Sequence, residues 1–131
     1  MAKFPIDNDI FEKIVKTLKS DLNVKAVTLL SRDGLMITHT LPKGIDVRLA
    51  APMASALVGT AEKIVEEFHR GEYKTCIVES SRGYTLTVSA GFQYILVVIA
   101  NRRADLKRIT RRMKLASKRI KKLMQQTSTK Y

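Results

Sequence analysis

The first stretch of the chain has apolar residues at intervals of three or four positions, as one face of a helix requires. These residues are Ile10, Phe11, Ile14, Val15, Leu18 and Leu22. Asp7 and Asp9 stand at the start of this stretch and offer side-chain oxygens that can cap the first turn of a helix. The pattern predicts a helix that ends near Asp21 or Leu22.

Two β-rich runs follow, at residues 24–30 and 35–41, and they are joined by Ser31-Arg32-Asp33-Gly34. An Asp-Gly pair supplies the positive φ angles that a tight hairpin turn requires. We therefore predict a β-hairpin. Residues 42–46 contain Pro42 and Gly44 and predict a loop.

A second helix is predicted from Val47 or Ala51 to about His69, with Gly71 as the residue that caps its C-terminal end. Pro52 either opens this helix or bends it, because proline removes a backbone hydrogen bond beyond the first turn.

The second helix carries two rows of side chains with different sizes. The bulky row is suited to packing on a sheet, and the small row would let another backbone approach closely. The bulky row is Met53, Leu57, Ala61, Ile64 and Phe68, and the small row is Ala51, Ser55 and Gly59.

Three more strands are predicted at residues 73–79, 84–90 and 94–100. The last of them is apolar on both faces, which is typical of a central strand covered by helices above and below. A final basic, amphipathic helix is predicted at about residues 104–125, followed by a flexible tail at 126–131. The order α-β-β-α-β-β-β-α predicts one α+β domain over residues 1–125, with a five-stranded, mostly antiparallel sheet and helices on both faces.

This succession resembles the Roadblock/dynein light chain superfamily, in particular its small bacterial and archaeal members. The resemblance covers about residues 8–120 and rests on the hairpin at 31–37, the Ala- and Gly-rich helix at 50–68 and the spacing of the three closing strands. It implies a Roadblock/profilin-like fold and a homodimer in which the third strand and the second helix of each subunit meet across a two-fold axis, giving one ten-stranded sheet. It also implies a small Ras-like GTPase as a protein partner, which the module regulates or scaffolds.

The resemblance further implies which residues form the dimer interface. Carried over to this chain, they are Ala51, Ser55 and Gly59 on the helix and Lys74, Cys76 and Val78 on the strand.

Charge is distributed very unevenly along the chain, whose net charge is +12. Residues 102–131 hold twelve Lys or Arg against one acid, Asp105, whereas residues 1–101 are almost neutral. The last helix nevertheless keeps a regular apolar stripe, which we expect to pack on the sheet beside the first helix; a free coiled-coil seam is the alternative. The stripe is Leu106, Ile109, Met113, Ala116, Ile120 and Leu123.

The rest of that helix forms a basic docking face, consisting of Lys107, Arg108, Arg111, Arg112, Lys114, Lys118, Arg119, Lys121 and Lys122. With only Asp105 to form a local pair, like charges four positions apart cost about 0.2–0.5 kcal/mol each. The face is therefore either merely solvated or a docking surface for an acidic protein, nucleic acid or an anionic membrane. This is the alternative function, a basic adaptor. Nucleic acid is not favoured, because the helix has no aromatic residues on which bases could stack. An anionic membrane is favoured even less if the apolar stripe is buried against the sheet, since only the Lys and Arg heads then reach lipid phosphates.

Catalytic and cofactor chemistry has little support in the sequence. His39, His69 and Cys76 lie in no recognisable nucleophile or metal-binding motif, and the chain has no P-loop. We expect no catalytic residues, no metal and no cofactor, and thus a protein that is not an enzyme. No apolar run approaches the ~20 residues of a membrane-spanning helix, so we expect a cytoplasmic protein.

Overall fold

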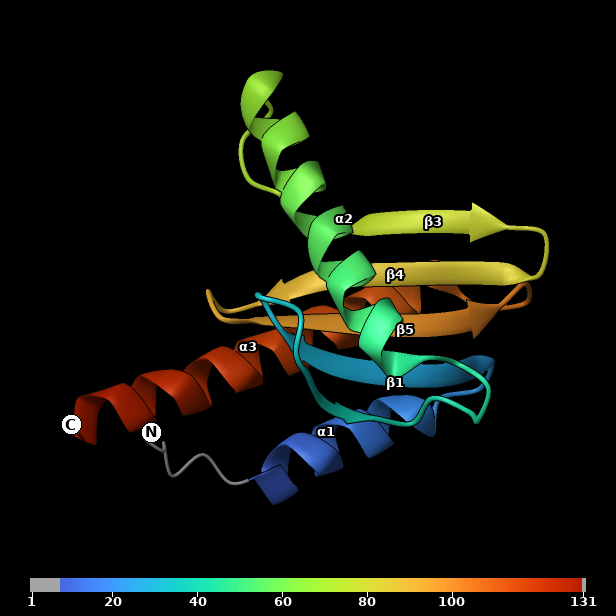
Figure 1. Ribbon diagram of the computed structural model, residues 1–131, viewed down its shortest axis with the longest axis horizontal. Coiled ribbons are helices and arrows are strands. Elements are labelled where there is room, and N and C mark those ends of the chain that lie inside the picture. Colours follow the sequence, from blue (N-terminus) through green and yellow to red (C-terminus); the bar gives the residue numbers. More distant parts are fainter. Residues whose placement is uncertain (1–7, 131) are drawn as a thin grey trace.

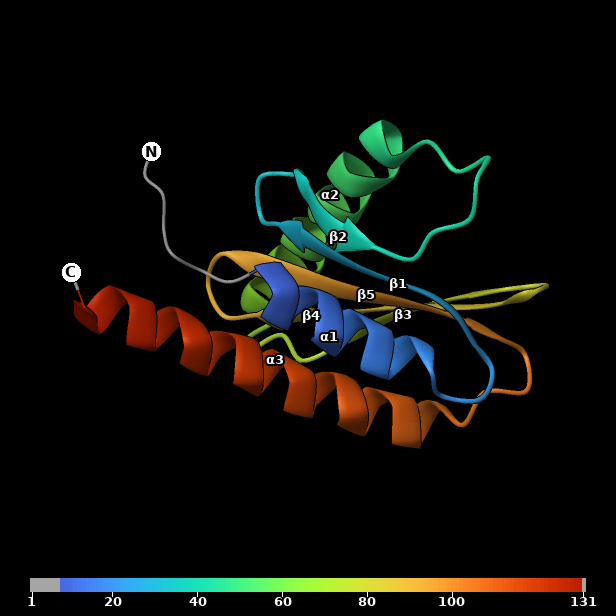
Figure 2. The same ribbon diagram turned by 90° about the horizontal axis from the view of Figure 1, so that it is seen from below.

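The computed structural model describes residues 8–130, and its side chains from Asp9 to Gln125. Three layers are visible in Figures 1 and 2: helices α1 and α3 lie side by side on one face of a five-stranded sheet, and α2 lies on the other face. The proposed cap at Asp7 lies outside the described residues. The elements are α1 (Asn8–Lys19), β1 (Val24–Ser31), β2 (Met36–His39), α2 (Val47–Glu67), β3 (Cys76–Ser80), β4 (Gly83–Ala90), β5 (Tyr94–Asn101) and α3 (Leu106–Lys130).

The sheet is antiparallel throughout, with the strand order β2-β1-β5-β4-β3. The predicted fold class is confirmed, and β5 is the central strand, as its two apolar faces indicated. Strand β3 is an edge strand, paired only with β4 through partners such as Cys76 and Thr87. The sheet therefore ends at β3 with one side of the strand unpaired in the single chain.

The main core lies between the sheet and the α1/α3 layer. Its helical part includes Phe11, whose ring meets the Tyr94 ring edge to face at 5.4 Å between centroids. The predicted stripe of α3 packs into this core, with Ile109, Met113 and Ile120 almost completely buried. The prediction was wrong for one member of the α1 stripe: Leu22 is 74% exposed, and the neighbouring Asp21 is buried instead.

A smaller core lies under α2, and here the two predicted rows of that helix change places. Ala51 from the small row is buried against the chain's own sheet, together with Val58 of the same helix. The bulky row does not face the sheet, because Met53 is 68% exposed and Ile64 and Phe68 are exposed too. The hairpin tip also comes very near this helix: a Cβ on Gly34 would lie 3.2 Å from Pro52 Cα.

The turns that bound these elements differ from the predictions in detail. The hairpin is confirmed, but only Gly34 has a positive φ (94°), and Asp33 does not. The Gly34 N–H donates to the Ser31 carbonyl at 2.9 Å, closing a type I turn followed by glycine rather than a two-residue turn.

Helix α2 begins after Asp46, whose carboxylate accepts a hydrogen bond from the Arg48 N–H. Pro52 thus lies inside the helix. At the other end His69, and not Gly71, takes the left-handed position next to the helix (φ 54°). The Arg70 N–H reaches the Val65 carbonyl and the His69 N–H reaches the Glu66 carbonyl, which is a Schellman motif.

Helix α3 starts at Leu106 and runs to Lys130, so residues 126–130, predicted as part of a tail, continue the helix. Its C-terminal end extends past the ends of the strands (Figure 1). The strong stripe over 106–123 explains the docking of the first part of α3, and the segment beyond it carries no such stripe.

Candidate interaction surfaces

An exposed apolar surface joins α2 and the edge strand β3. The flank of α2 that carries the bulky row includes Met53, Leu57 and Ile64, and Val78 of β3 is exposed on the same face of the sheet. Ile77 is exposed too, but it lies opposite Leu86 and so on the α1/α3 face. Large apolar side chains scattered singly on a surface are ordinary, but a contiguous group beside an open strand edge indicates a surface that another protein covers.

An apolar groove of about 380 Å³ runs beside this flank of α2. The sheet forms its floor through residues such as Val97 and Ile99, α2 forms one wall through Met53 and Leu57, and Val78 of β3 also lines it. The groove exists because a single helix crosses this face of the sheet and leaves part of it bare (Figure 1). The second apolar face of β5 is therefore only partly covered within one chain.

Arg32 fixes the position of α2 above the sheet. Its guanidinium pairs with Glu62 of α2 at 2.7 Å, donates to the Phe92 carbonyl at 2.7 Å and donates to the Ser89 hydroxyl at 3.1 Å. Its carbonyl accepts a hydrogen bond from the Ser55 hydroxyl. One arginine thus joins the β1–β2 turn, the β4–β5 turn and α2, and holds the helix with its bulky flank turned outward.

The six residues predicted for the dimer interface fall into two groups. Ala51 is only 2% exposed, so it has almost no surface left for a second chain, and Ser55 is partly buried by its bond to Arg32. Gly59 has no neighbour within 4 Å of where a Cβ would stand, and the β3 positions are accessible. These accessible positions are Gly59, Lys74, Cys76 and Val78.

Tyr73 anchors the segment that leads into β3. Its hydroxyl lies 2.8 Å from both the carbonyl and the hydroxyl oxygen of Thr87 on β4. Burial raises the pKa of the Tyr73 phenol above its ordinary value of 10.0, although the hydrogen bond to Thr87 opposes this shift. The phenol is therefore held neutral in the folded chain.

This pKa shift predicts a loss of stability in alkali. When the folded pKa of an acid is raised, the unfolded state loses its proton first, so the stabilisation is complete below pH 10.0 and is lost as pH rises through the folded pKa. We expect the unfolding free energy, measured with urea at a series of pH values around 10.0, to fall more steeply in the native chain than in Tyr73→Phe. Equal slopes in the two proteins would show that Tyr73 does not titrate in this way.

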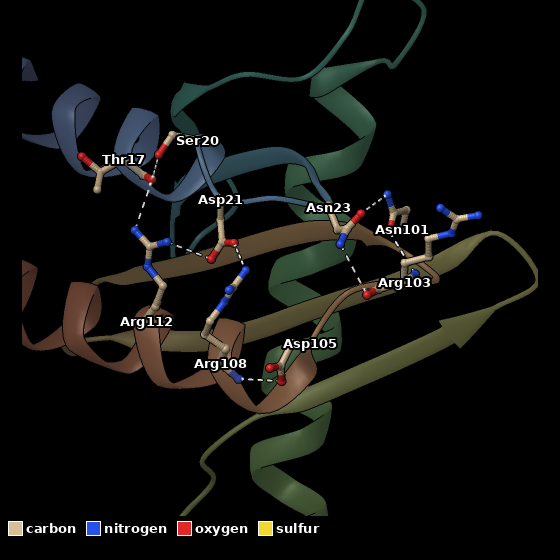
Figure 3. Close-up of polar contacts among 9 residues, drawn as sticks. All are labelled: Thr17, Ser20, Asp21, Asn23, Asn101, Arg103, Asp105, Arg108 and Arg112. Carbon is tan, nitrogen blue, oxygen red and sulfur yellow. Dashed lines mark hydrogen bonds and ion pairs between the residues drawn. The ribbon is translucent and has the colours of Figure 1, made fainter.

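The second candidate surface is the outer face of α3, which is held in place at its start by Asp21. The Asp21 carboxylate is buried and pairs with Arg112 at 2.8 Å and with Arg108 (Figure 3). Arg112 also donates to the Thr17 carbonyl of α1 at 3.5 Å. A single carboxylate at the end of α1 thereby ties the two helices of this layer together.

These pairs correct the predicted basic docking face in two respects. Arg108 and Arg112 have a counter-charge, which comes from Asp21 rather than from Asp105. Asp105 instead accepts a hydrogen bond from the Arg108 backbone N–H at 3.2 Å and so caps the start of α3. The other basic residues of the predicted face are exposed and form no ion pair among the described side chains: Lys107, Arg111, Lys114, Lys118, Arg119, Lys121 and Lys122.

Sequence reasoning missed Arg32 and Asp21 as organising residues. Arg32 stands in a turn, and the turn chemistry gave no sign that its side chain would reach α2. Asp21 did leave a signal, since it lies three positions after Leu18 and so on the apolar side of α1. A carboxylate at such a position requires a buried partner.

Two features are absent from the described residues. No described helix is long and apolar enough to cross a membrane. Nor do the described residues contain a group of three or more His, Cys, Asp or Glu side chains placed to hold a metal ion.

The arrangement of elements agrees with a known family, because the Roadblock/LC7 domain model matches residues 10–100. The chain belongs to the Roadblock/LC7 domain family. An uncharacterized protein of Methanocaldococcus jannaschii, MJ1340, is 33% identical to this Roadblock/LC7 chain over 112 residues, which are 86% of this chain and 97% of that protein.

Solved structures show the same fold at low sequence identity. Myxococcus xanthus MglB superposes with a TM-score of 0.87 at 20% identity, over 97% of this chain and 96% of that one. A Roadblock/LC7 domain from Streptomyces avermitilis superposes with a TM-score of 0.78 at 22% identity, over 86% of this chain and 96% of that one. These structures confirm the predicted fold, and the match of the Roadblock/LC7 domain model confirms the predicted family.

Proposed function

We propose that this Roadblock/LC7 chain is a homodimeric, non-enzymatic module of the cytoplasm that binds and regulates, or scaffolds, a small Ras-like GTPase. The observation that carries the proposal is the apolar surface shared by α2 and the open edge of β3, on a chain of this family. The resemblance implies a two-fold dimer built on these same two elements.

The dimer is supported by what each element lacks in the single chain. Strand β3 has a free edge that carries the exposed side chains of Ile77 and Val78, and such an edge invites pairing with another strand. No described segment of the chain covers the bulky flank of α2 or the apolar groove beside it. A second copy related by a two-fold axis supplies a β3 edge and an α2 flank together, because a two-fold interface uses the same patch twice.

The interface that we propose thus differs from the sequence-based one on α2. It uses the flank with Met53, Leu57 and Ile64 in place of the row with Ala51, which packs inside the chain. Gly59 lies two positions from Leu57 and so on a different side of the helix. The predicted positions Cys76 and Val78 on β3 are retained, together with Lys74, which precedes the strand.

A module of this kind acts on a GTPase without catalytic residues of its own. By binding one arrangement of the partner's switch segments more tightly than the other, it shifts the population between them. The difference in affinity between the two nucleotide states of the GTPase then sets the size of the effect.

The test is calorimetric titration of the full chain with the Ras-like GTPases of the organism that encodes it, each loaded with GDP or with a non-hydrolysable GTP analogue. We expect one of them to bind, with affinities that differ between the two nucleotide states. Lys114→Glu/Lys118→Glu is the control: it reverses two exposed charges on α3, which share a hollow with Glu62 and Glu66 but lie outside the bulky flank of α2, and it should keep this binding. Binding that is equal in both states and lost in the control would favour the basic adaptor.

A further inference from the structure

Most basic residues of α3 form no ion pair among the described side chains. Residues 106–130 of α3 contain no acid, and Asp21 neutralises only Arg108 and Arg112. The remaining basic residues of α3 are exposed along most of the helix. Three of them, Lys114, Lys118 and Lys121, also line a hollow that α3 shares with β4 and α2. We call the following set the α3 basic face: Lys107, Arg111, Lys114, Lys118, Arg119, Lys121 and Lys122.

This face is a rigid surface. Ile109, Met113 and Ile120 are buried on the inner side of the same helix, so the helix cannot rotate to spread its charges. Lysines and arginines three or four positions apart, such as Lys114 and Lys118, are held side by side against their mutual repulsion. A fixed group of cations attracts an anionic partner, and the repulsion between the cations is relieved when the partner binds.

One apolar side chain stands in the middle of the α3 basic face. Leu115 is 61% exposed, and its neighbours one turn away are Arg111 and Arg119. A leucine surrounded by cations fits a partner that offers anionic groups with an apolar layer just beneath them. An anionic phospholipid surface has that structure, since the headgroups lie above the acyl chains.

Nucleic acid fits these observations less well. The phosphates of a duplex would attract the cations, but they offer no apolar layer to Leu115. Binding to single strands uses aromatic side chains for stacking, and residues 106–130 have none.

We propose that the α3 basic face docks this protein onto a membrane of anionic phospholipid, with the cations on the headgroups and Leu115 entering the boundary between headgroups and acyl chains. A single chain already carries the complete α3 basic face and Leu115. In the dimer proposed above, the two-fold axis passes between the β3 strands perpendicular to the sheet, so both α3 basic faces lie on the same side of the assembly. A flat membrane can then contact both faces at once, and the second contact is made at a high effective concentration.

The test is co-sedimentation of the full chain with vesicles of phosphatidylcholine alone and of phosphatidylcholine mixed with phosphatidylserine. We expect binding only to the mixed vesicles, and weaker binding as salt is added. Each cation near the surface contributes about fivefold to binding, so Lys114→Glu/Lys118→Glu, which removes four units of charge, should weaken it by more than about a hundredfold. Leu115→Ser leaves the charge unchanged and should weaken binding by about three- to tenfold.

The control is Lys25→Glu/Lys43→Glu, which changes the net charge by the same amount at two exposed lysines outside α3. It should keep most of the binding. Each variant is first checked by circular dichroism for its helix content, which these exposed positions should not alter.

Equal binding to both kinds of vesicle, or equal losses in the α3 variant and in the control, would overturn the proposal. Stronger binding to duplex DNA than to the mixed vesicles would also overturn it and assign the face to nucleic acid. Failure here leaves the GTPase proposal intact, because that proposal predicts binding which the Lys114→Glu/Lys118→Glu variant retains.

Discussion

Replacing Met53 and Ile64 with glutamate is expected to convert the protein from two chains to one in solution. Both side chains are exposed on the flank of α2 that we assign to the two-fold interface. In a dimer of this double variant, the two substitutions in each chain would bring four unpaired carboxylates into a desolvated contact, which costs several kcal/mol per ion. In the single chain the same carboxylates stay in water, so folding should be preserved. The measurement is the mass from light scattering after size exclusion.

The matched control for this change is Leu22→Glu. Leu22 is as exposed as Met53 but lies between α1 and β1, away from α2 and β3. The control should keep the mass of two chains. If the α2 variant also keeps that mass, the interface lies elsewhere on the molecule.

Removing the two arginines that hold Asp21 is expected to destabilise the fold more than removing Asp21 itself. The side chain of Asp21 is 3% exposed, whereas those of Arg108 and Arg112 are 46% and 35% exposed. Arg108→Met/Arg112→Met leaves a buried carboxylate without a partner, and we expect a loss of about 3–5 kcal/mol. Asp21→Asn leaves two arginines that can turn to water, and we expect a loss of about 1–3 kcal/mol.

The measurement is urea unfolding at one fixed protein concentration, since a dimer's stability depends on concentration. Arg111→Met/Lys122→Met is the control, because it removes two α3 charges that have no counter-charge among the described residues. It should be neutral or slightly stabilising. A loss in the control as large as that in Arg108→Met/Arg112→Met would show that net charge, and not the Asp21 contact, sets the stability.

Periodicity predicted the parts of the fold that are governed by burial. The two apolar faces of residues 94–100 placed β5 at the centre of the sheet, and the α3 stripe placed that helix on the core. Both succeed because a buried position leaves a direct trace in residue type. The family resemblance then supplied the dimer hypothesis, for which periodicity alone had no information.

The rotation of α2 could not be read in the same way. Both of its rows look apolar in the sequence, and the choice between them depends on contacts with distant segments, such as the hydrogen bond from Ser55 to the Arg32 carbonyl. The sequence could not reveal the two partners of Asp21, because Arg108 and Arg112 lie on α3, 87 and 91 positions away. The Schellman end at His69 was hidden because Gly71, two residues later, gives the stronger sequence signal for a cap.

The central claim is that two copies of β3 lie together at the two-fold axis, and the distance between them tests it most directly. A nitroxide label on Glu79→Cys, in a Cys76→Ser background, places one spin on each β3 of the dimer. Because paired strands lie about 5 Å apart and β3 is short, the account predicts a dipolar distance below about 25 Å. A protein with the mass of two chains and no coupling in that range, or a protein that stays single at every concentration, would contradict it.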